Sequence, residues 1–154
     1  MSRYETLFSL RYAVRILERY ARLWQRIDGL LRLFAFLSGT SAIAALVSGS
    51  VPWSIAAGIF FAFMQGVEFS IAPARKHADA LAARKPYAAI LSGQAGFDDA
   101  ALEAAYQRAV AEDTVIVPEA LRPLAYNDAA TERGCAPDHL YSLTRWHRFV
   151  AFFA

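Results

Sequence analysis

The sequence predicts an all-α protein organised around a transmembrane helical hairpin, and three observations support this. The 35 residues from Leu33 to Val67 contain no Asp, Glu, Lys or Arg. A polar turn at about residues 48–52 interrupts this run near its middle. No stretch of β-type alternation long enough for an independent strand is present. Because one span needs about 20 residues, the uncharged run accommodates two short spans joined by the turn.

The composition agrees with a membrane location. Apolar residues make up 56% of the 154 residues and charged residues 19%, whereas soluble domains average about half and about 25%. The length fits a membrane hairpin with a small attached domain. We therefore divide the chain into a cytoplasmic amphipathic helix at 1–31, a hairpin at 32–72 and a cytoplasmic helical region at 73–154.

Charge is distributed unevenly along the chain. Residues 1–32 carry seven Arg against three acids, and 69–85 are also basic, whereas 86–154 carry five Arg against nine acids. Basic flanks stay on the cytoplasmic side of a membrane. An even number of crossings then puts both termini in the cytoplasm and the turn at about 48–52 on the outer side. The acidic final third is not expected to bind nucleic acid or anionic lipid.

Residues 4–31 predict one amphipathic helix that continues into the first span over about 40 residues. Its apolar residues recur at spacings of three and four, which is a heptad seam. The seam consists of Leu7, Leu10, Val14, Leu17, Ala21, Trp24 and Leu31. A second stripe is basic and consists of Arg11, Arg15, Arg19, Arg22 and Arg26.

The second span is predicted from about Trp53 to Ile71, with Pro52 in its first turn. Small residues recur every four positions along it, and this spacing lets helices approach closely in lipid. They are Gly58, Ala62, Gly66 and Ser70. We expect this face to meet the first span near Gly39. Pro73 is expected to kink the chain, and a following helix is expected to end before Pro86.

Three short helices are predicted after the breaker at 92–96. The first is capped by Asp98 or Asp99 and runs to about Glu112, and the second starts at Pro118-Glu119 and ends at Gly134. The last starts at Ser142 or Thr144 and runs to Phe153. Its aromatic and basic residues are expected either to cover the cytoplasmic helices, the favoured reading, or to dock on the membrane surface.

Arg32 and Glu68 bound the uncharged run and lie equally far from its centre. Three readings stay open: an ion pair that locks the hairpin, a charged ring at a pore mouth, or boundary residues that reach to water independently. Gln65 is the one strongly polar side chain well inside the second span. We expect it to form a hydrogen bond between subunits rather than to line a conduction path.

The basic residues near the membrane are read either as a solvated helix face or as contacts to lipid headgroups. They are Arg19, Arg22, Arg26, Arg75 and Lys76. Cys135, His139 and His147 are the residues that most resemble a chemical site, but their spacing does not match that of metal ligands on one helix. No phosphate loop, nucleophile elbow or paired carboxylate is present, so we expect no enzyme activity, metal or cofactor.

The order of these features resembles the SLATT group of small bacterial two-span membrane proteins. An Arg-rich helix passes through Trp24-Gln25-Arg26 into a short hairpin, and the basic segment Arg75-Lys76-His77 follows. A helical tail then carries Pro118-Glu119-Ala120-Leu121 and the spacing from Tyr126 to Gly134. The resemblance implies an antiphage effector that perforates the inner membrane when a nucleotide signal arrives. With no nucleotide-binding motif here, it implies a sensor partner or oligomerisation as the trigger. Small phage membrane proteins share the layout.

Three functions follow as expectations. The first is a homo-oligomer in the lipid bilayer whose hairpins form a pore or a membrane-disrupting patch, with the 4–31 helix holding subunits in register. The second is a non-conducting anchor whose acidic tail recruits a cytoplasmic partner. The third is a soluble helical protein with a buried apolar hairpin, which is disfavoured because a small domain has difficulty covering such helices on every side.

Overall fold

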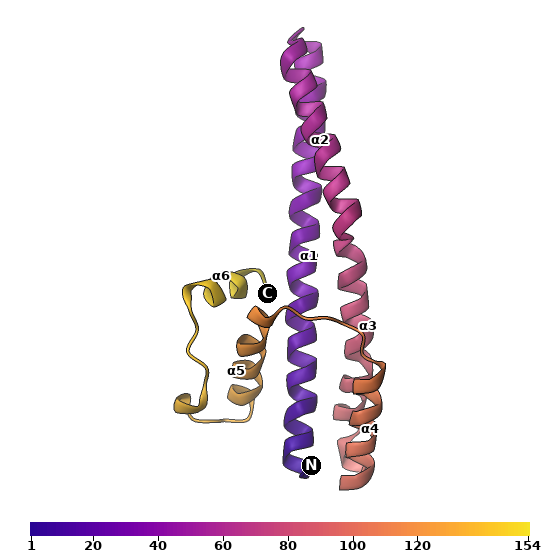
Figure 1. Cartoon of the computed structure of the whole chain (residues 1–154), viewed down its shortest axis with the longest axis vertical. Helices are drawn as coiled ribbons and strands as arrows, with labels where there is room; N and C mark the ends of the chain where they lie inside the picture. Colours follow the sequence, from indigo (N-terminus) through magenta and orange to yellow (C-terminus); the bar gives the residue numbers. More distant parts are fainter. The chain divides into compact units, whose positions relative to one another are not determined.

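The computed structural model describes residues 1–154 and contains helices and no strands (Figure 1), which confirms the predicted all-α class. The helices are α1 (Arg3–Val47), α2 (Val51–Ile71), α3 (Pro73–Ser92), α4 (Asp99–Glu112), α5 (Arg122–Glu132) and α6 (Arg145–Phe153). Three 3-10 turns separate them, η1 (Gln94–Gly96), η2 (Glu119–Leu121) and η3 (Pro137–His139). The chain divides into a hairpin unit, Trp24–Lys76, and a helical unit made of Met1–Leu23 and His77–Ala154.

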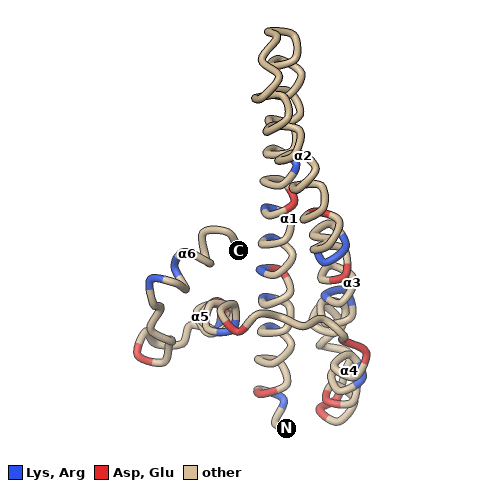
Figure 2. Tube along the Cα trace, turned by 45° about the horizontal axis from the view of Figure 1, so that its top comes forward, with Lys and Arg blue, Asp and Glu red and all other residues tan.

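The hairpin unit pairs the second half of α1 with α2. Gly49, at φ 75°, forms the turn between them, and its left-handed backbone is one that glycine adopts at little cost. Figure 2 shows the tip of this hairpin free of charged residues. Helix α1 and the segment Val51–Ser92, which contains α2 and α3, are each long and apolar enough to cross a membrane. Only 11% and 6% of the residues in their most apolar stretches are buried, so the hairpin has no core of the size a soluble domain needs.

A narrow face joins the two helices of the hairpin. Ala35 and Ser38 of α1 are buried, as are Ser54 and Met64 of α2. The hydroxyl of Ser38 donates to the carbonyl of Ala35 at 3.0 Å, and that of Ser54 donates to the carbonyl of Ser50 at 3.0 Å. These hydroxyls are therefore satisfied within their own helices and need neither water nor a partner.

The chain breaks its helix at Ala72, as expected from Pro73. A residue before proline is disfavoured in the α conformation, and Ala72 takes a left-handed one, with φ 47° and ψ 56°. Its N–H still donates to the carbonyl of Glu68 at 2.9 Å. The expected helix end before Pro86 is wrong, because α3 continues through Pro86 to Ser92. Proline removes one backbone donor, and the carbonyl it would have served belongs to the exposed Ala82.

The helical unit has its core along the first part of α1. The central seam residues Leu10, Val14, Leu17 and Ala21 are buried. Opposite them, the other helices contribute further buried side chains, which are Ala80, Tyr87, Leu102, Ala109, Leu121, Leu124 and Ala129. The seam is therefore occupied within the chain. The expectation that this seam holds subunits in register stays a prediction, and the structure shows its central residues buried within a single chain.

The ends of the later helices follow the sequence closely. The carboxylate of Asp98 accepts from the N–H of Ala101 at 2.7 Å and caps α4. Gly134 has φ 73° two residues after α5, and the hydroxyl of Thr144 accepts from the N–H of His147 at 3.2 Å to cap α6. These ends were predicted correctly because capping depends on a few adjacent residues.

Candidate functional site

The charged base of the hairpin unit joins Arg32 to two carboxylates. The Nε of Arg32 lies 2.9 Å from Oδ2 of Asp28, one turn earlier on α1, and 4.0 Å from Oε1 of Glu68 on α2. The predicted pairing partner Glu68 is thus present at the outer limit of an ion pair, and Asp28 is the closer one. Sequence reasoning passed over Asp28, although its position four residues before Arg32 is the spacing of a helical ion pair.

Asp28 is the most buried member of this base. Its side chain is 18% exposed, against 28% for Glu68 and 62% for Arg32. Its second oxygen, Oδ1, is buried and accepts no hydrogen bond. A buried carboxylate oxygen without a hydrogen-bond donor is costly. The single chain provides no donor for this oxygen of Asp28.

A hollow of about 560 Å³ opens at this base. Asp28, Gln65 and Glu68 line it, together with Arg75 and the backbone break at Ala72. Gln65 and Glu68 lie three residues apart on α2 and so are neighbours on the helix surface, and the Gln65 side chain is exposed. Close by in the same unit, Nζ of Lys76 lies 4.2 Å from the centre of the Trp24 ring, within the range of a cation–π contact.

The face of small residues on α2 does not make the hairpin contact. An added Cβ at Gly58 or Gly66 would meet no atom within 4 Å, and Ala62 and Ser70 are exposed. Gly39 does meet α2, but an added Cβ there would lie 3.6 Å from the ring of Phe61. The expectation that the small residues meet the first span is therefore wrong. A larger residue, on an adjacent face of α2, fills the space beside Gly39.

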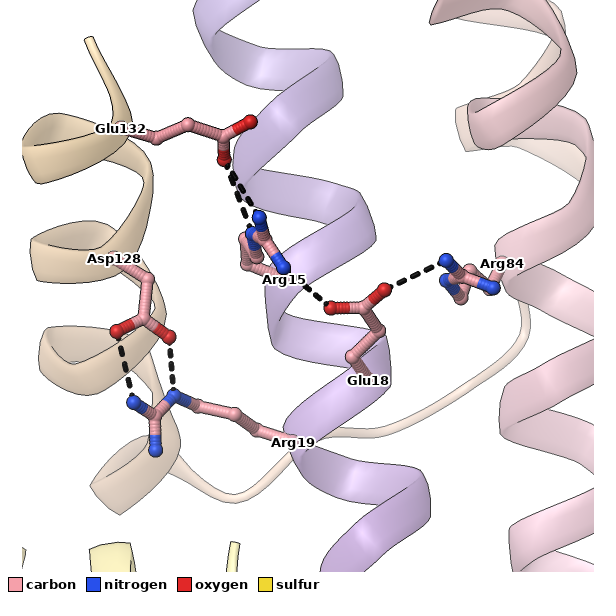
Figure 3. Close-up of polar contacts among 6 residues, drawn as sticks. All are labelled: Arg15, Glu18, Arg19, Arg84, Asp128 and Glu132. Atoms are coloured by element: carbon pink, nitrogen blue, oxygen red, sulfur yellow. Dashed lines mark hydrogen bonds and ion pairs between the residues drawn. The ribbon is translucent and has the colours of Figure 1, made fainter.

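Two arginines of the α1 stripe, Arg15 and Arg19, are paired within the helical unit (Figure 3). The guanidinium of Arg19 donates from Nε and one terminal nitrogen to the two oxygens of Asp128 on α5, at 2.6 and 2.8 Å. This two-point geometry is the strongest form of such a pair. Arg22, one turn further along α1, is exposed and forms no ion pair. Arg26 is also exposed.

A second set of ion pairs links three helices of the same unit (Figure 3). Arg15 donates to Glu132 of α5 at 3.0 Å and to Glu18 at 2.9 Å. Glu18 also accepts from Arg84 of α3, at 2.6 Å. The hydrogen bond to Glu132 raises the pKa of Arg15. Asp128 and Glu132 of the acidic final third thus pair with arginines of the basic first segment.

An aromatic pocket of about 530 Å³ lies on the helical unit and was not foreseen. Phe8 and Tyr12 of α1 line it with Tyr126 of α5 and with Tyr141. The amide side chain of Asn127 bonds both the N–H and the carbonyl of Tyr141, at 2.8 and 2.9 Å, and so fixes this wall. Burial raises the pKa of Tyr12. Only the clustering of aromatic residues near 126 and 141 could have indicated this pocket.

Cys135, His139 and His147 are not assembled into a site. Cys135 is a free thiol, and His139 ends the turn η3. The ring of His147 serves the capping box of α6, where its Nδ1 accepts from the N–H of Thr144 at 3.3 Å. No group of three or more His, Cys, Asp or Glu residues is placed to hold a metal ion.

No family model, no curated protein and no solved structure matches this chain. The resemblance to the SLATT group therefore depends on the layout of the sequence alone.

Proposed function

We propose that this chain is a two-span protein of the bacterial inner membrane, with both termini in the cytoplasm, whose hairpins assemble from several copies into a pore or a membrane-perturbing patch. The observation that carries the proposal is the exposure of the uncharged hairpin. Large apolar side chains point outward all along it, among them Phe36, Ile59 and Phe63. A surface of this kind is stable in lipid or against other copies, and unstable in water.

The unused small-residue face of α2 supports assembly. Without water, helices associate in a membrane through close packing and hydrogen bonds, and small residues permit the closest approach. Gly58, Ala62 and Gly66 are left open by the hairpin itself, so this face is available to a second copy. Gln65 is exposed on the same helix and is suited to a hydrogen bond between copies.

The hairpin base is the proposed control point of the assembly. Asp28 and Glu68 share Arg32, and one oxygen of Asp28 has no donor. A rearrangement of the helices on assembly that brought a donor to Asp28, or moved Arg32 toward Glu68, would change the balance of charge at the mouth of a pore. The resemblance to the SLATT group adds the proposal that a nucleotide-signalling partner, or oligomerisation itself, triggers this change.

The structure gives less support to the alternative function, a non-conducting membrane anchor that recruits a partner. It needs an acidic tail that is free to recruit a partner, but Asp99, Asp128 and Glu132 are engaged with arginines of the same chain. Membrane perturbation is therefore the function that the arrangement supports best, and we expect the protein to act without catalytic chemistry.

Leakage of a trapped dye from liposomes that carry the purified protein tests this proposal. We expect the rate of leakage to rise with the number of protein molecules per liposome. We also expect it to change several-fold when Glu68→Gln or Asp28→Asn removes one negative charge from the hairpin base, which corresponds to about 1 kcal/mol in the equilibrium between closed and open states. Arg108→Gln, a charge removal at an exposed site on α4, is the matched control and should leave leakage unchanged. Absence of leakage for every oligomer size would favour the anchor instead.

A further inference from the structure

Helix α6 presents aromatic and cationic side chains together on one exposed face. With about 100° of rotation per residue, six side chains lie within an arc of about 160°. In order around the helix they are Arg148, Phe152, Arg145, Phe149, Phe153 and Trp146, and all except the half-buried Phe153 are exposed. The opposite side carries the less exposed His147, Val150 and Ala151, and the helix contacts η2 and α5.

The aromatic part of this face is continuous. Trp146 is 61% exposed and Phe149 is 56% exposed, and their rings stack with centres 5.6 Å apart. The ring of Phe149 in turn lies 5.3 Å from that of Phe153. Contiguous exposed aromatic surface of this kind marks an interaction site more often than scattered apolar residues do. The sequence predicts that this segment covers the cytoplasmic helices, but only one side of α6 packs against the helical unit and the other side is exposed.

All the charged side chains in residues 139–154 are positive. No Asp or Glu occurs from His139 to the last residue, and neither Arg145 nor Arg148 forms an ion pair in the structure. The acids that make the final third negative all lie at or before Asp138. The expectation that the final third avoids anionic lipid therefore applies to 86–138 and does not extend to α6.

We propose that the exposed face of α6 binds the surface of an anionic bilayer. Helices with arginines beside Trp and Phe lie in the headgroup region, where the rings enter the boundary and the cations meet lipid phosphates. The capping box at Thr144 already forms the helix, so binding does not have to order it. A second copy fits this face poorly, because a two-fold contact sets the arginines against each other.

Tryptophan quenching in nanodiscs tests this inference, which rests on the proposed membrane location. The full chain with Trp24→Phe and Trp53→Phe keeps Trp146 as its single tryptophan. In phosphatidylcholine discs that also contain phosphatidylglycerol, we expect lipids brominated near the headgroup to quench Trp146, and quenching by aqueous acrylamide to fall about twofold. A Trp146 that stays equally open to acrylamide with and without the anionic lipid would overturn the proposal.

Two controls make the result specific. In the same background, Arg148→Gln should abolish the effect of the anionic lipid, whereas Arg108→Gln, an equal charge change on exposed α4, should preserve it. If Arg148→Gln and Arg108→Gln reduced the effect of the anionic lipid on Trp146 quenching equally, a specific role for α6 would be contradicted. A variant that keeps only Trp53 reports whether the hairpin is inserted, so failure of α6 is separated from failure of the membrane proposal. Protection of Trp146 in detergent without lipid would identify a protein contact and overturn the inference.

Discussion

At the residue scale, single side chains tie distant segments of the helical unit together. Tyr87 of α3 is buried, and its hydroxyl donates to Oδ2 of Asp113 at 3.1 Å, with the carbonyl of Ala109 at 3.3 Å. Burial, and then the charge of Asp113, raise the pKa of Tyr87 well above its usual range. The hydroxyl therefore stays protonated as a donor, and it attaches α3 to the end of α4.

This contact predicts a pH-dependent stability. Tyr87→Phe should lower the free energy of unfolding by about 1 kcal/mol at neutral pH. Because the pKa is raised on folding, the contribution of Tyr87 is complete below the unfolded value of about 10 and declines as the pH rises above it. Urea unfolding in detergent should therefore show the two proteins converging at alkaline pH. Tyr106→Phe, which removes a neighbouring hydroxyl that forms no such bond, should cause a smaller loss of stability at neutral pH. A gap between wild type and Tyr87→Phe that stays constant with pH would contradict the account.

At the element scale, the helical unit is braced by the contact between α1 and α5. Its strongest link is the two-point pair of Arg19 with Asp128, whose side chains are 16% and 32% exposed. Partial burial and a fixed geometry make such a pair worth more than the usual exposed ion pair. The arginine stripe is thus a structural element of the helical unit over part of its length.

A double-mutant cycle measures this brace. Arg19→Gln and Asp128→Asn should each destabilise the protein, and their coupling energy should be about 1 kcal/mol. The same cycle with Arg22→Gln in place of Arg19→Gln is the control, and its coupling should lie within about 0.3 kcal/mol of zero. Equal coupling in the two cycles would show that general charge, and not this contact, is responsible.

The elements also show what the sequence could predict. The ends of α4 and α6, the turn at Gly49 and the break at Pro73 depend on neighbouring residues, and each was predicted from them. The pairing of Arg19 with Asp128 joins residues 109 positions apart, and no local pattern indicates it. The contact face of α2 was assigned wrongly because small-residue spacing indicates where a helix can approach another, but not whether that helix belongs to the same chain.

At the scale of the whole molecule, the chain consists of two units with different surfaces and cores. The helical unit has buried leucines, capped helices and paired charges, as a domain in water has. The hairpin unit exposes its apolar side chains and satisfies its hydroxyls internally, as a segment in lipid has to do. The long helix α1 contributes residues to both units. On the proposal made above, the charged base of the hairpin then lies where the chain leaves the lipid.

The most direct test of the membrane hairpin is the accessibility of single cysteines. Cys135 is the one native cysteine, and Ser50→Cys in a Cys135→Ala background places the thiol at the hairpin turn. We expect a large maleimide-polyethylene glycol to label the Ser50→Cys protein after only the outer membrane has been opened, and to label Cys135 only after the inner membrane is broken. Labelling of both thiols from the same side of the intact inner membrane would contradict a hairpin that crosses it.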